Sequence, residues 1–440
     1  MATPSRVLYI THASPIPAKL GPSRRHYHIL DQLSRFYEVH LLSLGTPLQQ
    51  ELFASTIGTK ITRFDFAHVL QAGIKKFVCK AWRTANMQCD FVPVNEPNLR
   101  RLCRDLTSSV PFDAIVLSTL LLRELPLPDH TPIVADTHNV EFDVLKRTYD
   151  CAGSLLRKQY ARRQASATFL AEYKCARKVD LLLATSHRDG RIFEEELSAK
   201  VVEVVPNGVD IQEFAPEEQL GEPETILFTG LMSYYPNQHA IRWFMDSVFP
   251  LVLREVPRVK LVVAGAGPPS WLLAKRGRSV EVAGLVPDMR PYFTRARVVI
   301  APLMIAGGTR VKILEAQAMS RPVVSTSVGA EGLNTVDGES ILIADDATTF
   351  ARQIVRLLVD VDLAKRIARN ARTHVVSEYD WNRIGEHLES VLRKHIGLVP
   401  ADELQRFPRI DWAFARTYST QWLNTGRRDS MSLPVSALGH

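Results

Sequence analysis

A glycine pair between an apolar run and a helical segment is the part of this sequence best suited to chemistry. The run 298–303 is short and rich in β-branched residues, as in a strand buried on both faces. Gly307 and Gly308 follow it and free the backbone to approach a ligand. We expect a helix from about Thr309 to Met319, whose unpaired N–H groups and positive dipole end suit a phosphate.

Two charged side chains on that expected helix could complete an anion site. Lys312 and Glu315 are three residues apart and therefore share one helix face. A cation and a carboxylate behind a glycine loop can hold a diphosphate and a ribose together. The alternative is a solvated ion pair worth a few tenths of a kcal/mol. Arg310, at the start of the helix, can reach a phosphate in bidentate fashion, or it is a surface arginine.

Composition limits the classes of protein that this chain can represent. A length of 440 residues favours two domains, and 46% hydrophobic with 23% charged residues is typical of soluble globular proteins. No apolar run approaches the ~18 residues of a membrane-spanning helix, and residues 1–15 lack the apolar core of a signal peptide. We therefore expect a cytoplasmic protein. Its five scattered cysteines indicate reduced thiols.

The positive charge is concentrated in the first half of the chain. Residues 1–200 carry 27 Lys and Arg against 20 Asp and Glu, which accounts for the whole net charge of +7. Much of the excess lies in residues 146–178. A basic surface of this kind suits an anionic membrane or a diphosphate-bearing acceptor, and a solvated face without a partner is the alternative. No basic-aromatic motif accompanies the charge, so we do not expect nucleic-acid binding.

Strand-like runs alternate with helical patterns along the chain, which indicates parallel α/β architecture. Ligands of such sheets bind beyond the carboxyl ends of the strands. The Pro-, Gly- and acid-rich segment 206–224 reads as a linker between two domains, 1–205 and 225–379. We expect strands at 6–11, 38–44, 113–118, 132–136, 180–185 and 201–205, and then at 225–230, 259–264, 279–283, 297–302 and 322–326.

Residues 308–324, GTRVKILEAQAMSRPVV, resemble the signature of glycosyltransferase family 4. They are most similar to the branch written G-T-R-I-K-x-L-E-A-x-A-x-G-x-P-V-V, with Ser320 in place of the usual glycine. The linker resembles the family's P-N-G-V-D-x-x-x-F hinge at 206–214, and the likeness extends over about residues 6–396. It implies a GT-B fold, in which two Rossmann-like, doubly wound domains face each other across a cleft. It also implies that a helix at 380–400 returns to the first domain, whereas it says nothing about the tail 401–440.

The resemblance places a nucleoside-diphosphate sugar on the second domain. Gly230 corresponds to the glycine that ends the first strand of that domain. Family members often have basic residues after it, but 231–235 read LMSYY, so the diphosphate would fall to Arg310 and Lys312. The segment 280–293 is similar to one that contacts the nucleobase, which makes Gly284, Leu285 and Val286 the candidates for that role.

The family's E-x7-E pair is only half present. Glu315 matches the glutamate that binds the ribose hydroxyls, whereas the first glutamate, which lies near the donor sugar, is Gly307 here. Backbone N–H groups of Gly307, Gly308 and Thr309 are the candidates to replace it.

The first domain offers two further candidates, which the resemblance would place near the acceptor. His138 follows the expected strand 132–136 and is either a general base or polar contact, or a loop histidine without such a role. Arg24 belongs to the loop 11–28, which approaches the donor or acceptor in related enzymes, and is a candidate phosphate contact.

The resemblance implies retaining transfer of a sugar, hexosyl in type, in bacterial surface polysaccharide or glycolipid synthesis. The partners would be a nucleotide-sugar donor, a saccharide or lipid-linked acceptor and an anionic membrane surface at the inner face of the cell membrane. No cofactor and no metal are expected, because the Asp-x-Asp triplet 360–362 reads as the start of a helix capped by Asp362. The rival functions are a nucleotide-sugar epimerase and a non-catalytic sugar-nucleotide-binding protein. A dehydrogenase is disfavoured because the first loop lacks G-x-G-x-x-G.

Overall fold

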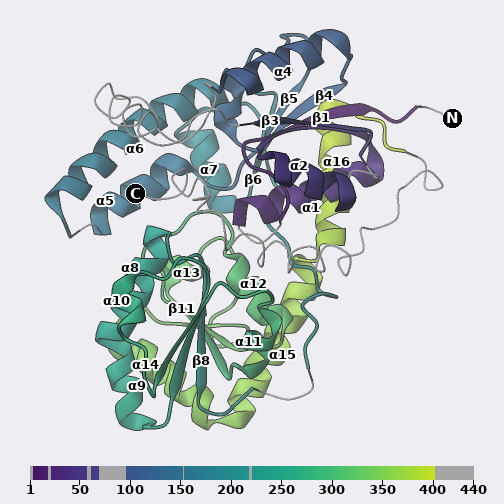
Figure 1. The fold of residues 1–440 in the computed structure, drawn as a ribbon. Helices are drawn as coiled ribbons and strands as arrows, with labels where there is room; N and C mark the ends of the chain where they lie inside the picture. Colours follow the sequence, from purple (N-terminus) through teal and green to yellow (C-terminus); the bar gives the residue numbers. More distant parts are fainter. Residues whose placement is uncertain are drawn as a thin grey trace. The chain divides into compact units, whose positions relative to one another are not determined.

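A computed structural model gives the fold of the chain (Figure 1). It describes residues 3–17, 21–56, 61–68, 96–151, 153–217 and 221–401. The chain forms two compact units, one that runs to Asn207 and resumes at Trp381, and one from Gly208 to Asp380. Cys79, Cys89 and, beyond Ala401, the expected C-terminal tail lie outside the described residues.

The first unit is built on a parallel sheet of seven strands in the order β3-β2-β1-β4-β5-β6-β7. Strands β4 and β6 are buried along their whole length, as their unbroken apolar sequences predict for strands covered on both faces. The strands are β1 (Arg6–Thr11), β2 (Glu38–Gly45), β3 (Arg63–His68), β4 (Ala114–Leu117), β5 (Ile133–Asp136), β6 (Leu181–Ala184) and β7 (Val202–Val204).

Helices cover both faces of this sheet, and the last of them comes from the end of the described chain. Helix α16 packs against α1, where the His28 ring stacks on Trp381 at 4.6 Å between centroids. The chain therefore returns to the first unit after the second one is complete. The helices are α1 (Gly21–Phe36), α2 (Pro47–Thr56), α4 (Pro97–Ser109), η2 (Leu120–Glu124), α5 (Glu141–Cys151), α6 (Leu155–Ala176), α7 (His187–Glu195) and α16 (Trp381–Ile396).

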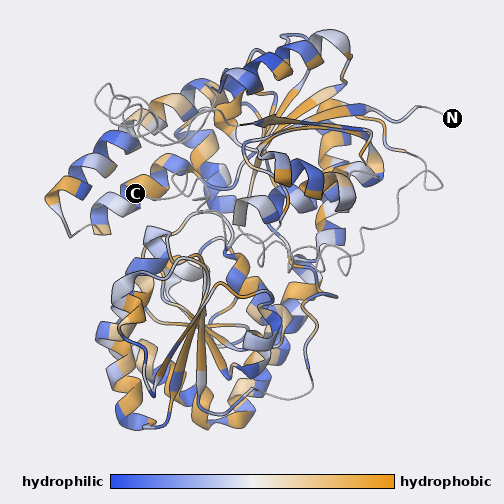
Figure 2. Cartoon of the chain, viewed as in Figure 1, coloured by the Kyte–Doolittle hydropathy of each residue, from blue (hydrophilic) through white to orange (hydrophobic). Residues whose placement is uncertain are grey.

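The second unit is a six-stranded parallel sheet in the order β10-β9-β8-β11-β12-β13. Figure 2 shows its strands as mostly hydrophobic, in keeping with burial on both faces. The strands are β8 (Thr225–Thr229), β9 (Lys260–Ala264), β10 (Val280–Gly284), β11 (Val298–Ala301), β12 (Val323–Ser325) and β13 (Leu342–Ile343).

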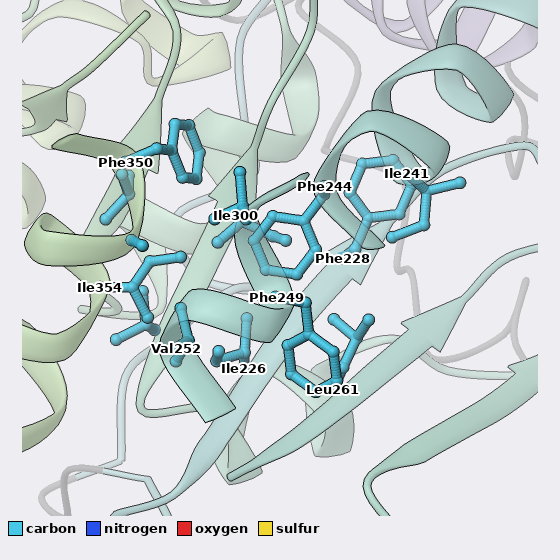
Figure 3. Packing of buried hydrophobic residues seen from close by; sticks show 14 of the residues in the cluster. Ile226, Phe228, Ile241, Phe244, Phe249, Val252, Leu261, Ile300, Phe350 and Ile354 are labelled. Atoms are coloured by element: carbon cyan, nitrogen blue, oxygen red, sulfur yellow. The ribbon is translucent and has the colours of Figure 1, made fainter. Parts of the chain in front are cut away.

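Aromatic and branched side chains fill the space between this sheet and its helices (Figure 3). Phe228 and Ile300 of the sheet are fully buried, as are Phe244 and Phe350 of the helices. The helical segments are α8 (Tyr235–Trp243), η3 (Phe244–Val248), α9 (Phe249–Glu255), α10 (Ser270–Leu273), α11 (Arg290–Arg295), α12 (Val311–Ala318), α13 (Ser327–Ala330), α14 (Ala347–Val359) and α15 (Val361–Glu378).

Both sheets have the same doubly wound topology, so the predicted pair of Rossmann-like domains is confirmed. In each sheet the strand order reverses beside the first strand of the unit, between β1 and β4 and between β8 and β11. Such reversal points open a crevice at the carboxyl ends of the strands, where ligands of this architecture bind.

Three local predictions were wrong. Helix α12 begins at Val311 instead of Thr309, which leaves Arg310 at the capping position. Helix α15 is capped by Asp360 instead of Asp362, because the Asp360 side chain accepts a hydrogen bond from the Leu363 N–H at 2.9 Å. Strands β3 and β13 were missed, since the first is a partly exposed edge strand with alternating charge and the second has two residues.

Candidate functional site

Three glycines at the ends of neighbouring strands bring the backbone of the second unit very close together. The Gly230 N–H donates to Ala264 O at 3.0 Å, and the Gly265 N–H donates to Gly284 O at 2.8 Å. A Cβ atom built on Gly265 would lie 1.7 Å from the Gly230 carbonyl oxygen, so no side chain fits there. Gly265 and Gly230 also have φ of +147° and +151°, which L-residues rarely adopt. The strand ends of β8, β9 and β10 thus form one tightly packed rim.

Lys312 extends from α12 to this rim and is held there by Asn237. Its Nζ donates a hydrogen bond of 2.8 Å to Asn237 Oδ1, and Asn237 Nδ2 donates to Leu231 O at 2.9 Å. The same Nζ lies 4.6 Å from the centre of the Phe228 ring, a cation–π arrangement. A Cβ on Gly230 would come within 2.9 Å of Nζ, which explains why glycine is needed where β8 ends.

Burial and, to a smaller extent, the nearby Arg310 charge together lower the pKa of the Lys312 ammonium to about 7. In the absence of an anion the ammonium is therefore easily lost near neutral pH. An anion bound beside Nζ would favour the charged form and raise this pKa. Lys312 is thus a cation whose charge depends on what occupies the site.

Arg310 is engaged with the protein's own backbone. Its Nη1 donates to the carbonyl oxygens of Gly308 and, at 2.8 Å, Glu331, and its Nη2 donates to Val328 O at 2.6 Å. The guanidinium also lies 3.5 Å from the Glu331 carboxylate, and its side chain is only 5% exposed. Arg310 therefore ties the loop that follows β11 to α13 and to Glu331, the residue after it.

The remaining candidates of this loop and helix lie close by. Gly308 has φ of +62°, so the glycine pair makes the turn that the sequence predicted. Thr309 and Glu315 are buried, with Glu315 on the second turn of α12, whereas Gly307 is partly exposed.

The three candidates for nucleobase contact lie at the end of β10. Gly284 has φ of +72° and open space around the position of a Cβ atom. Leu285 is 51% exposed, whereas Val286 is buried. An exposed apolar side chain beside an open turn is compatible with a planar ring lying against it.

In the first unit, His138 lies beside histidines that the sequence analysis did not select. Its Nε2 is 2.9 Å from His26 Nε2, and the His12 ring is 4.9 Å from the His26 ring, edge-on. His12 follows β1, where its ring Nδ1 contacts Ser118 Oγ at 3.0 Å. Burial lowers the pKa of all three imidazoles, that of His12 to about 4, and so all three are neutral near pH 7.

The arginine pair of the first loop contains one buried member. Arg25 forms a fully buried ion pair with Asp136 at the end of β5, and its Nη1 donates to Asn207 Oδ1 at 2.9 Å. Arg24, the predicted phosphate contact, precedes it on α1 and is partly buried. Because Asn207 is the last residue of the first unit before the chain leaves it, Arg25 anchors the start of the linker.

Asn237, His12 and His26 were missed by sequence reasoning. The two histidines lie in the segment 11–28, which the resemblance had singled out, but only the fold brings them to His138. Nothing in the sequence pairs Asn237 with a lysine 75 residues away. The described residues contain no group of three or more His, Cys, Asp or Glu placed to hold a metal ion, and no helix among them is long and apolar enough to span a bilayer.

Comparison with known proteins gives a family model that matches part of the chain, and a fold. Residues 223–360 match the family model described as glycosyl transferases group 1. Sucrose-phosphate synthase from Thermosynechococcus elongatus superposes with a TM-score of 0.67 at 16% identity, over 89% of this chain and 98% of that one. Anabaena HepE in complex with UDP-glucose superposes with a TM-score of 0.64 at 13% identity, over 89% of this chain and 100% of that one.

The fold is GT-B. This confirms the predicted fold class of the chain.

Two relatives in sequence are bacterial proteins. An uncharacterised 44.6 kDa protein in the cps region of Klebsiella pneumoniae is 28% identical over 175 residues, or 36% of this chain and 43% of that protein. The other relative is a GDP-mannose-dependent mannosyltransferase of Corynebacterium glutamicum that acts on a monoacylated phosphatidylinositol monomannoside. It is 26% identical over 242 residues, which are 50% of this chain and 64% of that protein. The match therefore spans less than two thirds of either relative.

Proposed function

We propose that this GT-B protein is a retaining glycosyltransferase of family 4, in the G-T-R-I-K-x-L-E-A branch. It takes a hexosyl-type sugar from a nucleoside-diphosphate donor and transfers it to a saccharide or lipid-linked acceptor in bacterial surface polysaccharide or glycolipid synthesis. The second unit binds the donor and the first unit the acceptor. The observation that carries the proposal is Lys312, held by Asn237 against the glycine rim at the point where the strand order of the second sheet reverses.

The chemistry assigned to this rim is electrostatic. As the bond between sugar and diphosphate breaks, negative charge grows on the leaving diphosphate. Lys312 and the N–H groups of Gly307, Gly308 and Thr309 face that charge without needing to reorganise. The transfer is proposed to need no cofactor and no divalent metal, and activity that persists in excess EDTA would support this.

The other candidates divide the donor between them. Glu315 is assigned to the ribose hydroxyls, and the turn at Gly284, Leu285 and Val286 to the nucleobase. Arg310 is assigned a positioning role instead of the phosphate contact expected from the sequence, because its guanidinium already binds three carbonyl oxygens.

Association with an anionic membrane is the second part of the proposal. Helices α5 and α6 lie side by side, and α6 begins with Leu155 and Leu156, which are 80% and 84% exposed (Figure 1). Arg157, Arg162 and Arg163 on the same helix are exposed as well. Exposed leucines bordered by arginines suit insertion between acidic headgroups.

A donor screen tests the function and separates it from its rivals. UDP- and GDP-sugars are incubated with the full chain, with and without lipid-linked or saccharide acceptors, and the products are resolved by mass and by NMR of the new linkage. A new α- or β-linkage that keeps the anomeric configuration of the donor supports retaining transfer. Epimerised or hydrolysed sugar formed equally well without acceptor would favour the epimerase. Tight nucleotide binding without turnover would favour a non-catalytic binding protein.

A further inference from the structure

Two histidine rings in the first unit face each other through the same kind of nitrogen atom. His26 Nε2, on α1, is 2.9 Å from His138 Nε2, in the segment between β5 and α5. Two neutral rings can form this contact only if one nitrogen carries a proton and the other does not. The question is which ring donates.

A backbone carbonyl group on the other side of the His26 ring identifies the donor. Its Nδ1 lies 3.2 Å from the carbonyl oxygen of Ala13, which can only accept a hydrogen bond. Nδ1 must therefore carry the proton. His26 is fully buried, and burial together with the nearby His12 and Arg25 lowers its pKa, so it has only that one proton. Its Nε2 is left with a lone pair and is the acceptor.

His138 must then donate through Nε2. Its own pKa is lowered by burial and by the nearby His26 and Arg25, so it too is neutral and its Nδ1 has a free lone pair. His138 remains partly exposed, and the Thr185 hydroxyl fixes its backbone by donating to the His138 carbonyl oxygen at 3.2 Å. Among the described residues no hydrogen bond to His138 Nδ1 is found.

We propose that His26 is a positioning residue that holds His138 in the tautomer whose Nδ1 accepts a hydrogen bond from a hydroxyl group of a bound saccharide. In this chain of hydrogen bonds, His26 Nδ1–H donates to Ala13 O, and His138 Nε2–H donates to His26 Nε2. The chain ends at Nδ1 of His138. That the ligand is a saccharide rests on the proposed function, whereas the tautomers of the two rings do not depend on it.

The charges around the pair decide what His138 does with that lone pair. Arg25 and Asp136 form a buried ion pair, and a second positive charge beside the guanidinium is unfavourable. A ring that resists protonation is a poor general base but a good hydrogen-bond acceptor. His138 therefore orients a hydroxyl group and does not remove its proton.

NMR of the wild-type protein tests the tautomers without any substrate. Long-range ¹H–¹⁵N correlation at pH 7.5 separates protonated from bare ring nitrogens, and His26→Gln and His138→Gln assign the signals. We expect a bare Nε2 in His26, a bare Nδ1 in His138 and a scalar coupling between the two Nε2 atoms across their hydrogen bond. A protonated His26 Nε2, or an imidazolium at either position, would overturn the proposal.

Kinetics of the full chain test the positioning role once a donor and an acceptor are in hand. His138→Phe and His26→Phe should each lower kcat/KM by roughly three- to tenfold, the scale of one hydrogen bond. The double variant should be no slower than His138→Phe, since His26 acts only through His138. His26→Gln, which offers an amide acceptor, should recover part of the rate. Losses that multiply in the double variant would contradict the proposal, whereas no transfer by the wild type would contradict only the proposed function.

Discussion

Lys312 Nζ donates a 2.8 Å hydrogen bond to Asn237 Oδ1, and this contact sets the position of the lysine in the proposed diphosphate site. The Asn237 side-chain amide donates a hydrogen bond to Leu231 O, so its carbonyl oxygen is turned toward the lysine. The lysine is then fixed beside Gly230 with a pKa near neutrality. A neutral asparagine, instead of a carboxylate, leaves the positive charge available to a ligand.

The pH dependence of nucleotide affinity should follow Lys312. Without ligand its pKa is about 7, and a bound diphosphate raises it, so the protonated form binds more tightly. Affinity should be greatest below pH 7 and fall by up to about tenfold per pH unit above it, until the raised pKa of the complex is reached. Calorimetry between pH 7 and 9, where the terminal phosphate (pKa about 6) is already ionised, should show proton uptake on binding. A Lys312→Met variant with the same pH dependence would exclude this assignment.

Removal of the Asn237 side chain should loosen the lysine without removing it. Asn237→Ala deletes one hydrogen bond to a charged group, and we expect nucleotide affinity to fall by about 1–2 kcal/mol. Asn237→Asp should also weaken nucleotide binding, because a carboxylate competes with the phosphate for Lys312. Both variants are measured by calorimetry beside Asn370→Ala on α15. Equal affinities in all three would mean that Asn237 has no role in the site.

The glycine rim should tolerate no side chain at Gly265. A Cβ there would lie 1.7 Å from a backbone oxygen, so Gly265→Ala must displace β8 or β9. We expect a loss of several kcal/mol in unfolding free energy, beyond the 1–2 kcal/mol of backbone strain alone. Gly284→Ala is the matched control, because it has positive φ but open space. Similar thermal unfolding of the two variants would show that the rim is looser than described.

The sequence predicted the architecture well because buried parallel strands have unbroken apolar sequences, as in β4 and β6. It also selected Lys312, Gly230 and the turn at Gly308, since glycine and lysine leave local signals. It could not show that Arg310 points into the backbone, because a guanidinium that binds three carbonyl oxygens looks the same in sequence as one that awaits a phosphate. The contact between His26 and His138 joins residues 112 positions apart and has no local pattern.

Vesicle co-sedimentation tests the proposed membrane contact. Leu155→Gln/Leu156→Gln should lower binding to acidic vesicles, and salt should weaken the binding that remains, because exposed charges are screened beyond about 8–10 Å at physiological ionic strength. Leu48→Gln is the control, since Leu48 is 52% exposed on α2. Unchanged sedimentation of the double variant would show that the start of α6 does not contact the membrane. Salt-independent binding to neutral vesicles would contradict its electrostatic part.

Calorimetry with UDP and GDP tests whether the second unit binds a nucleoside diphosphate through Lys312. We expect one of them to bind the wild type. Lys312→Ala should weaken the diphosphate far more than the matching nucleoside, and Glu315→Gln should weaken both by about 1–3 kcal/mol. Lys260→Ala, an exposed lysine at the start of β9, should bind as the wild type does. Unchanged diphosphate affinity in a folded Lys312→Ala variant would show that Lys312 does not bind the diphosphate.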